Sequence, residues 1–162
     1  MIRMSTLSHI LLGQWQGIRA LTYDYLAQLS TEQLALRLPF ETSQNLGYQF
    51  WCMTGAHESY LAKLETGGWQ GFVCSLNGAG EITPGLIEEK MRAGDASMAG
   101  LLAEIDLEQP LANGQPAYEV VMQMIKHEMH HHGQLINFLY CHRLPIPVSW
   151  QDEWALASHF HC

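Results

Sequence analysis

The spacing of apolar residues restricts the fold of this chain more than any other feature. Four long stretches carry apolar residues at a helical period, and no segment shows sustained alternation of apolar and polar residues. In the first stretch, about residues 6–29, one side of a helix collects Leu7, Ile10, Leu11, Ile18, Leu21 and Tyr25. The pattern therefore predicts an all-α protein.

Capping residues predict where the other helices begin. Ser43 is a candidate cap for a second helix that ends at the glycines after residue 66. Thr83 and Pro84 supply a cap and a first-turn proline for a third helix that reaches about residue 105, and Pro116 opens a fourth that reaches about residue 142. Helices of about 20–26 residues are about 30–39 Å long. We therefore expect a four-helix bundle with long inter-helix loops.

Length, charge and cysteine usage bound the organisation and the partners. The 162 residues predict one domain, residues 1–162, with a C-terminal tail from about Val148. The formal net charge of −8, with no run of Lys and Arg, argues against nucleic acid or an anionic membrane as partner. The first residues resemble neither a secretion signal nor a membrane span, and the four cysteines form no C-x-x-C pair. We expect a reduced, cytoplasmic protein.

The fourth predicted helix contains the segment KHEMHHHGQ, residues 126–134. At 100° per residue, His127 and His131 lie about 40° apart, on the same side as the apolar residues of that helix. His130 falls at the flank of this side, and His132 is predicted to project away from it. Glu128 lies about 100° from His127, where we expect a solvated carboxylate.

A third histidine, His57, lies in the middle of the apolar side of the second predicted helix. Burying three imidazoles in one small bundle is costly unless each finds a partner, which is either a core hydrogen bond or a shared metal ion. Neutral imidazole binds zinc, nickel and iron. We therefore predict a divalent metal site at His57, His127 and His131, with zinc or nickel favoured and iron as an alternative.

The motif H-E-x-x-H in the same segment is also the signature of helical zinc proteases. Those enzymes take a third ligand downstream, either a His in H-E-x-x-H-x-x-G-x-x-H or a Glu on a following helix. Here Gly133 comes one place too early, position 137 is Asn137, and the one downstream glutamate is Glu153, in the short tail. The protease interpretation is therefore disfavoured.

The helix-two histidine in GAHESYL and the helix-four run HEMHHHGQLINFL together resemble the DinB/YfiT-like superfamily of small four-helix proteins. The resemblance covers essentially the whole chain in length and helix order. It implies one divalent ion held by His57, His127 and His131, and often a homodimer. His132 stands where many members carry Arg. Family members with known activity are mostly thiol-dependent transferases or isomerases that use a low-molecular-weight thiol as cosubstrate.

Three protein ligands would leave a position on the ion for a thiol or a water molecule, whose pKa the metal lowers. Gln134, on the inward side of the same helix, is expected to hydrogen-bond the bound nucleophile or an imidazole, or else the backbone. The main hypothesis is a metal-dependent transferase or isomerase acting on a small molecule. The alternatives are a metal-dependent hydrolase of a small ester or amide and a non-enzymatic metal-binding stress protein, so enzyme activity itself stays open.

Overall fold

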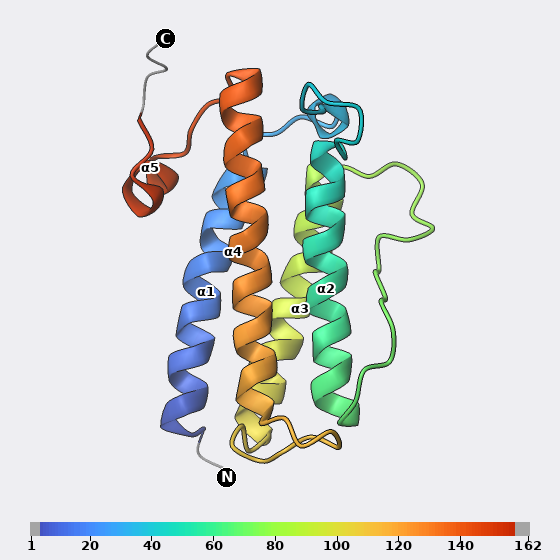
Figure 1. The fold of residues 1–162 in the computed structure, drawn as a ribbon, viewed down its shortest axis with the longest axis vertical. Helices are drawn as coiled ribbons and strands as arrows, with labels where there is room; N and C mark the ends of the chain where they lie inside the picture. Colours follow the sequence, from blue (N-terminus) through green and yellow to red (C-terminus); the bar gives the residue numbers. More distant parts are fainter. Residues whose placement is uncertain (1–3, 158–162) are drawn as a thin grey trace.

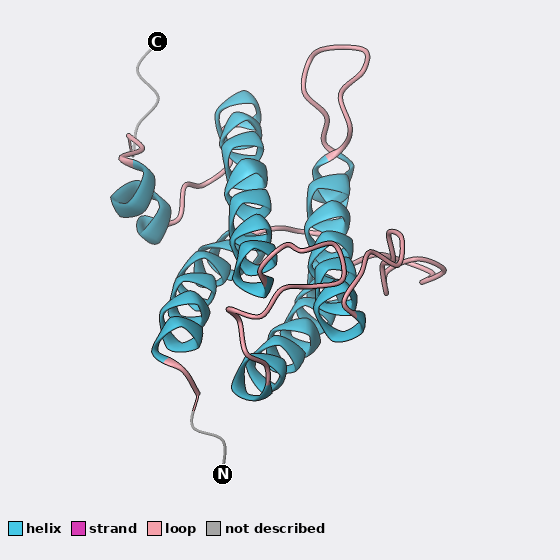
Figure 2. Cartoon of the chain, turned by 60° about the horizontal axis from the view of Figure 1, so that its bottom comes forward, coloured by secondary structure: helices cyan, strands magenta, loops and turns pink. Residues whose placement is uncertain are grey.

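The computed structural model describes residues 4–157, and its regular structure is helical (Figures 1 and 2). Four long helices lie side by side: α1 (Thr6–Leu26), α2 (Leu46–Thr66), α3 (Pro84–Glu104) and α4 (Ala117–His142). A short 3-10 helix, η1 (Glu32–Ala35), precedes α2, and α5 (Val148–Trp154) follows α4. Residues 4–157 form no strand, only two isolated bridges. The all-α prediction is confirmed.

The beginning of α2 differs from the prediction. Its cap is Asn45 and not Ser43, because the Asn45 Oδ1 atom accepts a hydrogen bond of 2.8 Å from the backbone N–H of Tyr48. The Ser43 hydroxyl closes the preceding loop instead, where it accepts from the Leu38 N–H at 3.0 Å and donates to the Gln44 carbonyl at 2.8 Å. Ser43 therefore shapes the segment that leads into α2.

The predicted start of α3 and the predicted ends of α2, α3 and α4 agree with the structure, whereas α1 ends at Leu26, before the predicted bound at about residue 29. Thr83 caps α3 by accepting from the Leu86 N–H at 3.1 Å, and Pro84 occupies its first turn. Gly67 ends α2 in the left-handed conformation, with φ of 78°. Pro116 is the residue before α4. These local signals are sufficient to bound the long helices within a few residues.

The core lies between the four long helices. α2 packs against α3 and α4, and α1 packs against the same two helices. Each helix contributes large side chains that are almost completely buried, such as Trp15, Phe50, Met91 and Phe138. In residues 4–157, no helix combines the length and the hydropathy that a membrane span requires.

The connection between α2 and α3 runs along the outside of α2 (Figure 1). It passes over Gly55, where an added Cβ would lie 2.9 Å from the Cys74 Cβ and would also collide with the Phe72 ring. Glycine is required here because the loop approaches the helix backbone so closely. This loop thereby covers part of the outer face of α2.

The predicted tail forms α5 and packs against α1. Trp150 is completely buried, and its indole N–H donates to the Leu21 carbonyl at 2.7 Å. The same indole lies 5.0 Å from the Tyr25 ring and 4.6 Å from the His132 ring, measured between centroids. The α5 helix therefore closes one side of α1 and α4.

Candidate metal centre

Three side chains from two helices converge where α2 and α4 pack together. The ligand atoms of Cys52, His127 and His131 all lie within 4.8 Å of one another. The Cys52 Sγ atom is 3.7 Å from the His127 Nε2 atom, and the two imidazole centroids are 4.6 Å apart. In residues 4–157 no other three histidine, cysteine or acidic side chains meet this criterion. A group of this kind could hold a metal ion.

The His131 ring is oriented by Gln49, which lies one turn before Cys52 on α2. The His131 Nδ1 atom is 2.7 Å from the Gln49 Oε1 atom. With this amide oxygen as acceptor, Nδ1 carries the proton and Nε2 keeps its lone pair. A hydrogen bond on the far nitrogen is the usual support of a metal-binding histidine.

The protonation states of the group are also consistent with metal binding. Burial lowers the pKa of His131 to about 3, and the neighbouring His127, His130 and His132 add to this effect. Burial likewise lowers the pKa of His127. Both imidazoles are therefore neutral near pH 7, the state in which a histidine binds a metal. Burial raises the pKa of Cys52, so its sulfur is a neutral thiol until a cation displaces the proton.

His57 is buried as predicted, but it lies apart from the Cys52–His127–His131 group. Its ring centroid lies 4.4 Å from that of Trp15, with the two planes tilted by 39°, and its Nδ1 atom is 3.1 Å from the Arg19 Nη2 atom. Because arginine can only donate, Nδ1 is the acceptor and Nε2 carries the proton. That Nε2 atom is buried without a hydrogen-bond partner. Burial and Arg19 hold the pKa of His57 well below its usual range.

Arg19 connects His57 to two acidic side chains. Its guanidinium donates to the Asp95 Oδ1 atom at 3.2 Å and to the Glu128 Oε1 atom at 3.0 Å. Asp95 also accepts from the Trp15 indole at 2.9 Å and from the Tyr23 hydroxyl. This polar network links α1, α3 and α4, and through His57 it also reaches α2.

The predictions that Glu128 and His132 face solvent are wrong. Each is 1% exposed. The Thr22 hydroxyl lies between them, 2.5 Å from the Glu128 Oε1 atom and 2.7 Å from the His132 Nε2 atom. The prediction considered only the apolar side of α4, but α4 also packs against α1, where Arg19 and Thr22 supply polar partners. The buried arc of α4 is therefore wider than its apolar stripe.

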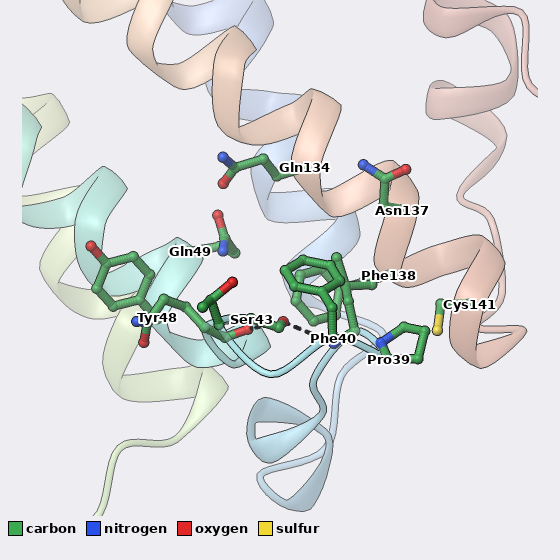
Figure 3. Close-up of a pocket in the computed structure, with 12 residues that line it drawn as sticks. Pro39, Phe40, Ser43, Tyr48, Gln49, Gln134, Asn137, Phe138 and Cys141 are labelled. Carbon is green, nitrogen blue, oxygen red and sulfur yellow. Dashed lines mark hydrogen bonds between the residues drawn. The ribbon is translucent and has the colours of Figure 1, made fainter.

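A cavity of about 660 Å³ adjoins the candidate metal centre (Figure 3). It lies between the segment 38–44, the first turns of α2 and the C-terminal half of α4. Gln49, the partner of His131, is part of its wall, and so is Gln134. The Gln134 carboxamide is 2.9 Å from the Nε2 atom of the exposed His130, so it contacts an imidazole, one of the partners expected for it.

Sequence reasoning overlooked Cys52, which was considered only as a possible half of a cysteine pair. One signal was available. Gln49 and Cys52 are three residues apart on α2 and therefore share a face of that helix. His127 and His131 are four residues apart and share a face of α4 in the same way. In an antiparallel pair of helices these two faces can meet at matching heights. The C-terminal segment HFHC, whose His159, His161 and Cys162 are candidate adventitious metal binders by residue type, lies outside the described residues.

Comparison with known proteins adds no assignment. No protein-family model, curated protein sequence or solved structure matches the chain.

Proposed function

We propose that this chain is a four-helix protein of the DinB/YfiT-like type that holds one divalent metal ion through Cys52, His127 and His131 and catalyses nucleophilic chemistry on a small molecule. The observation that carries the proposal is the convergence of three ligand atoms within 4.8 Å from α2 and α4. In this proposal Cys52 takes the ligand position that the resemblance assigns to His57.

The donor set is chemically suited to such an ion. Two neutral imidazoles and one thiolate form a mixed nitrogen and sulfur set, which zinc accepts readily and which nickel or iron also tolerate. Three protein ligands are typical of catalytic zinc sites, in which a further position is open to water or substrate. The metal would lower the pKa of a water molecule or a small thiol bound at that position and so supply a nucleophile at neutral pH.

The surrounding residues would orient the reactants. Gln49 holds the His131 ring through its Nδ1 atom, and the cavity beside it gives a small molecule access to this end of the site. In the reaction we propose, the thiol sulfur forms a bond to an electrophilic carbon of the substrate. The leaving group departs with the electron pair of the broken bond, and the thiol proton passes to solvent.

Metal content by plasma mass spectrometry on tag-free protein tests the site. We expect about one zinc or nickel ion per chain in the wild type, and its loss in Cys52→Ala and His131→Ala variants whose circular dichroism remains helical. The control is Cys141→Ala, because Cys141 is an exposed cysteine outside the group. Loss of metal in His57→Ala together with full retention in Cys52→Ala would overturn the proposed ligand set in favour of His57.

The same preparation separates the possible activities. Conjugation of a small thiol with an electrophile, lost on removal of the metal, would support the transferase proposal. Turnover of esters or amides without any thiol would indicate a hydrolase instead. Stoichiometric metal with no position open to an exchangeable ligand would indicate a metal-binding protein without this chemistry.

A further inference from the structure

The cavity beside the candidate metal centre has one end near the proposed ligands and one end at the surface. Gln49 and Gln134 lie at one end, and Pro39, Phe40 and Cys141 lie at the other (Figure 3). Gln49 is only 6% exposed and contacts His131 directly. A molecule in the cavity would therefore be separated from the His131 ring by a single carboxamide.

The wall of this cavity carries no charged side chain. Its 12 lining residues include no Asp, Glu, Lys, Arg or His, although the chain as a whole has a net charge of −8. The nearby Arg37 guanidinium is not part of the wall, and it donates to the Ser43 carbonyl at 2.5 Å. A charged ligand group would lose hydration here without gaining a counter-charge, which disfavours binding.

The polar part of the wall consists mainly of carboxamides. Four side chains share this group: Gln44, Gln49, Gln134 and Asn137. A carboxamide has two donor hydrogens and an acceptor oxygen, and Gln49, Gln134 and Asn137 each use one of these groups inside the protein. The remaining donors and acceptors suit a ligand that carries neutral amide, hydroxyl or carbonyl groups. Because the Gln49 oxygen is engaged by His131, the Gln49 amino group is available to donate to such a ligand.

The other part of the wall is aromatic. The Phe40 side chain is 57% exposed and Tyr48 is 38% exposed, although both line the cavity, and the Phe138 ring is buried beside them. An apolar ring placed against Phe40 would remove this exposed aromatic surface from water, which favours binding. The volume of about 660 Å³ is in the range of small-molecule sites.

We propose that this cavity is the substrate pocket of the metal centre, and that it selects uncharged molecules with an aromatic or apolar body and amide-like or hydroxyl groups. The proposal names the substrate class of the proposed function, and the description of the ligand as a substrate rests on that function. Carboxylate-bearing and ammonium-bearing analogues of the same size are disfavoured by the uncharged wall. The selection is a property of binding and does not require the metal.

Three probes with a phenylalanine framework test the ligand class at about pH 6, where an α-amino group is protonated: N-acetylphenylalanine amide is neutral, N-acetylphenylalanine is anionic and phenylalanine amide is cationic. We would titrate each into the full chain, stripped of metal with a chelator, and follow binding by calorimetry and backbone NMR. We expect the neutral probe to bind at least about tenfold more tightly than either charged probe, a difference of about 1.4 kcal/mol. The backbone NMR signals that change chemical shift when the neutral probe binds should include those of Phe40 and Asn137.

Two isosteric substitutions with the same change in charge provide the matched control. Asn137→Asp places a carboxylate in the wall, whereas Gln16→Glu adds one at an exposed position of α1 outside the cavity. Asn137→Asp should weaken binding of the anionic probe and strengthen binding of the cationic probe, each by several-fold. Gln16→Glu should change neither affinity. Equal responses of the two variants would overturn the proposal.

The remaining outcomes separate this inference from the metal proposal. A charged probe that binds as tightly as the neutral one, or no binding of any probe up to its solubility limit, overturns the ligand class whatever the metal content. If the neutral probe binds most tightly but the protein binds no metal, the result supports a pocket for uncharged ligands and overturns the proposed metal chemistry.

Discussion

At the scale of single residues, the most consequential side chain is Arg19, which is 1% exposed and satisfies two carboxylates and an imidazole. A buried charge is stable only while its partners are present. Removing Arg19 would leave the Glu128 carboxyl group in the core without its counter-charge, with the Thr22 hydroxyl as its remaining partner. Burial already raises the pKa of Glu128, and Arg19 opposes that shift.

We therefore predict that Arg19→Met lowers the free energy of unfolding by about 3–5 kcal/mol. The double variant with Glu128→Gln should recover a measurable part of this loss, because the unpaired charge is gone. Urea denaturation followed by circular dichroism measures both values. Arg92→Met is the control, because the Arg92–Glu88 pair is exposed and should contribute at most about 1 kcal/mol. Equal losses for Arg19→Met and Arg92→Met would contradict the prediction.

The burial of His57 should make the stability of the fold depend on pH. Arg19 and Asp95 face its ring, and its pKa in the folded protein lies well below the ordinary value of 6.5. Below pH 6.5 the unfolded chain binds a proton at His57 that the folded protein does not, so stability falls as pH falls. In metal-free protein, the stability of the wild type relative to His57→Gln should be about 1.4 kcal/mol lower at pH 5.5 than at pH 7.5. A difference independent of pH would contradict this explanation.

At the scale of the helix, two glycines in the interior of α3, Gly94 and Gly100, have opposite surroundings. A Cβ at Gly94 would lie 2.9 Å from the His57 Nδ1 atom, whereas one at Gly100 meets nothing within 4 Å. Close packing of α3 against His57 therefore depends on the first glycine only. The second lowers the helix propensity without any packing benefit.

Alanine at these two positions should have effects of opposite sign. Gly100→Ala should raise the free energy of unfolding by about 0.5–1 kcal/mol, the usual difference in helix propensity. Gly94→Ala should lower it, because the added methyl group displaces the His57 ring from Arg19. Thermal and urea denaturation of the two variants, with the same substitution in the same helix, measure the contrast. Stabilisation by both would show that His57 moves without cost.

At the scale of the whole molecule, the candidate metal centre joins α2 to α4. Its ligands Cys52 and His127 are 75 residues apart in the sequence. A ligand that binds only the folded state stabilises it by mass action, by about 2.7 kcal/mol at a concentration 100 times its Kd. Zinc should therefore raise the melting temperature of the wild type and of Cys141→Ala, but not of Cys52→Ala or His131→Ala. Differential scanning calorimetry with and without zinc provides the measurement, and an equal shift in all four proteins would contradict a site at Cys52 and His131.

The helical class, the approximate bounds of the long helices and the inward direction of His131 and His57 all follow from patterns in the amino-acid sequence. These properties are local. The helical period, the Thr83–Pro84 start and the glycine after α2 act within one or two turns of the chain, so a helical wheel and capping preferences are sufficient to find them.

Which of the inward side chains meet depends on how the helices pack together. The rotation of each helix and the relative height of α2 and α4 are set by packing among all the helices, which no single helical wheel contains. That packing places Cys52 beside His127 and His131, and it turns His57 toward Arg19 instead. It also buries Glu128 and His132, because α1 and α5 cover a part of α4 that its apolar residues do not mark.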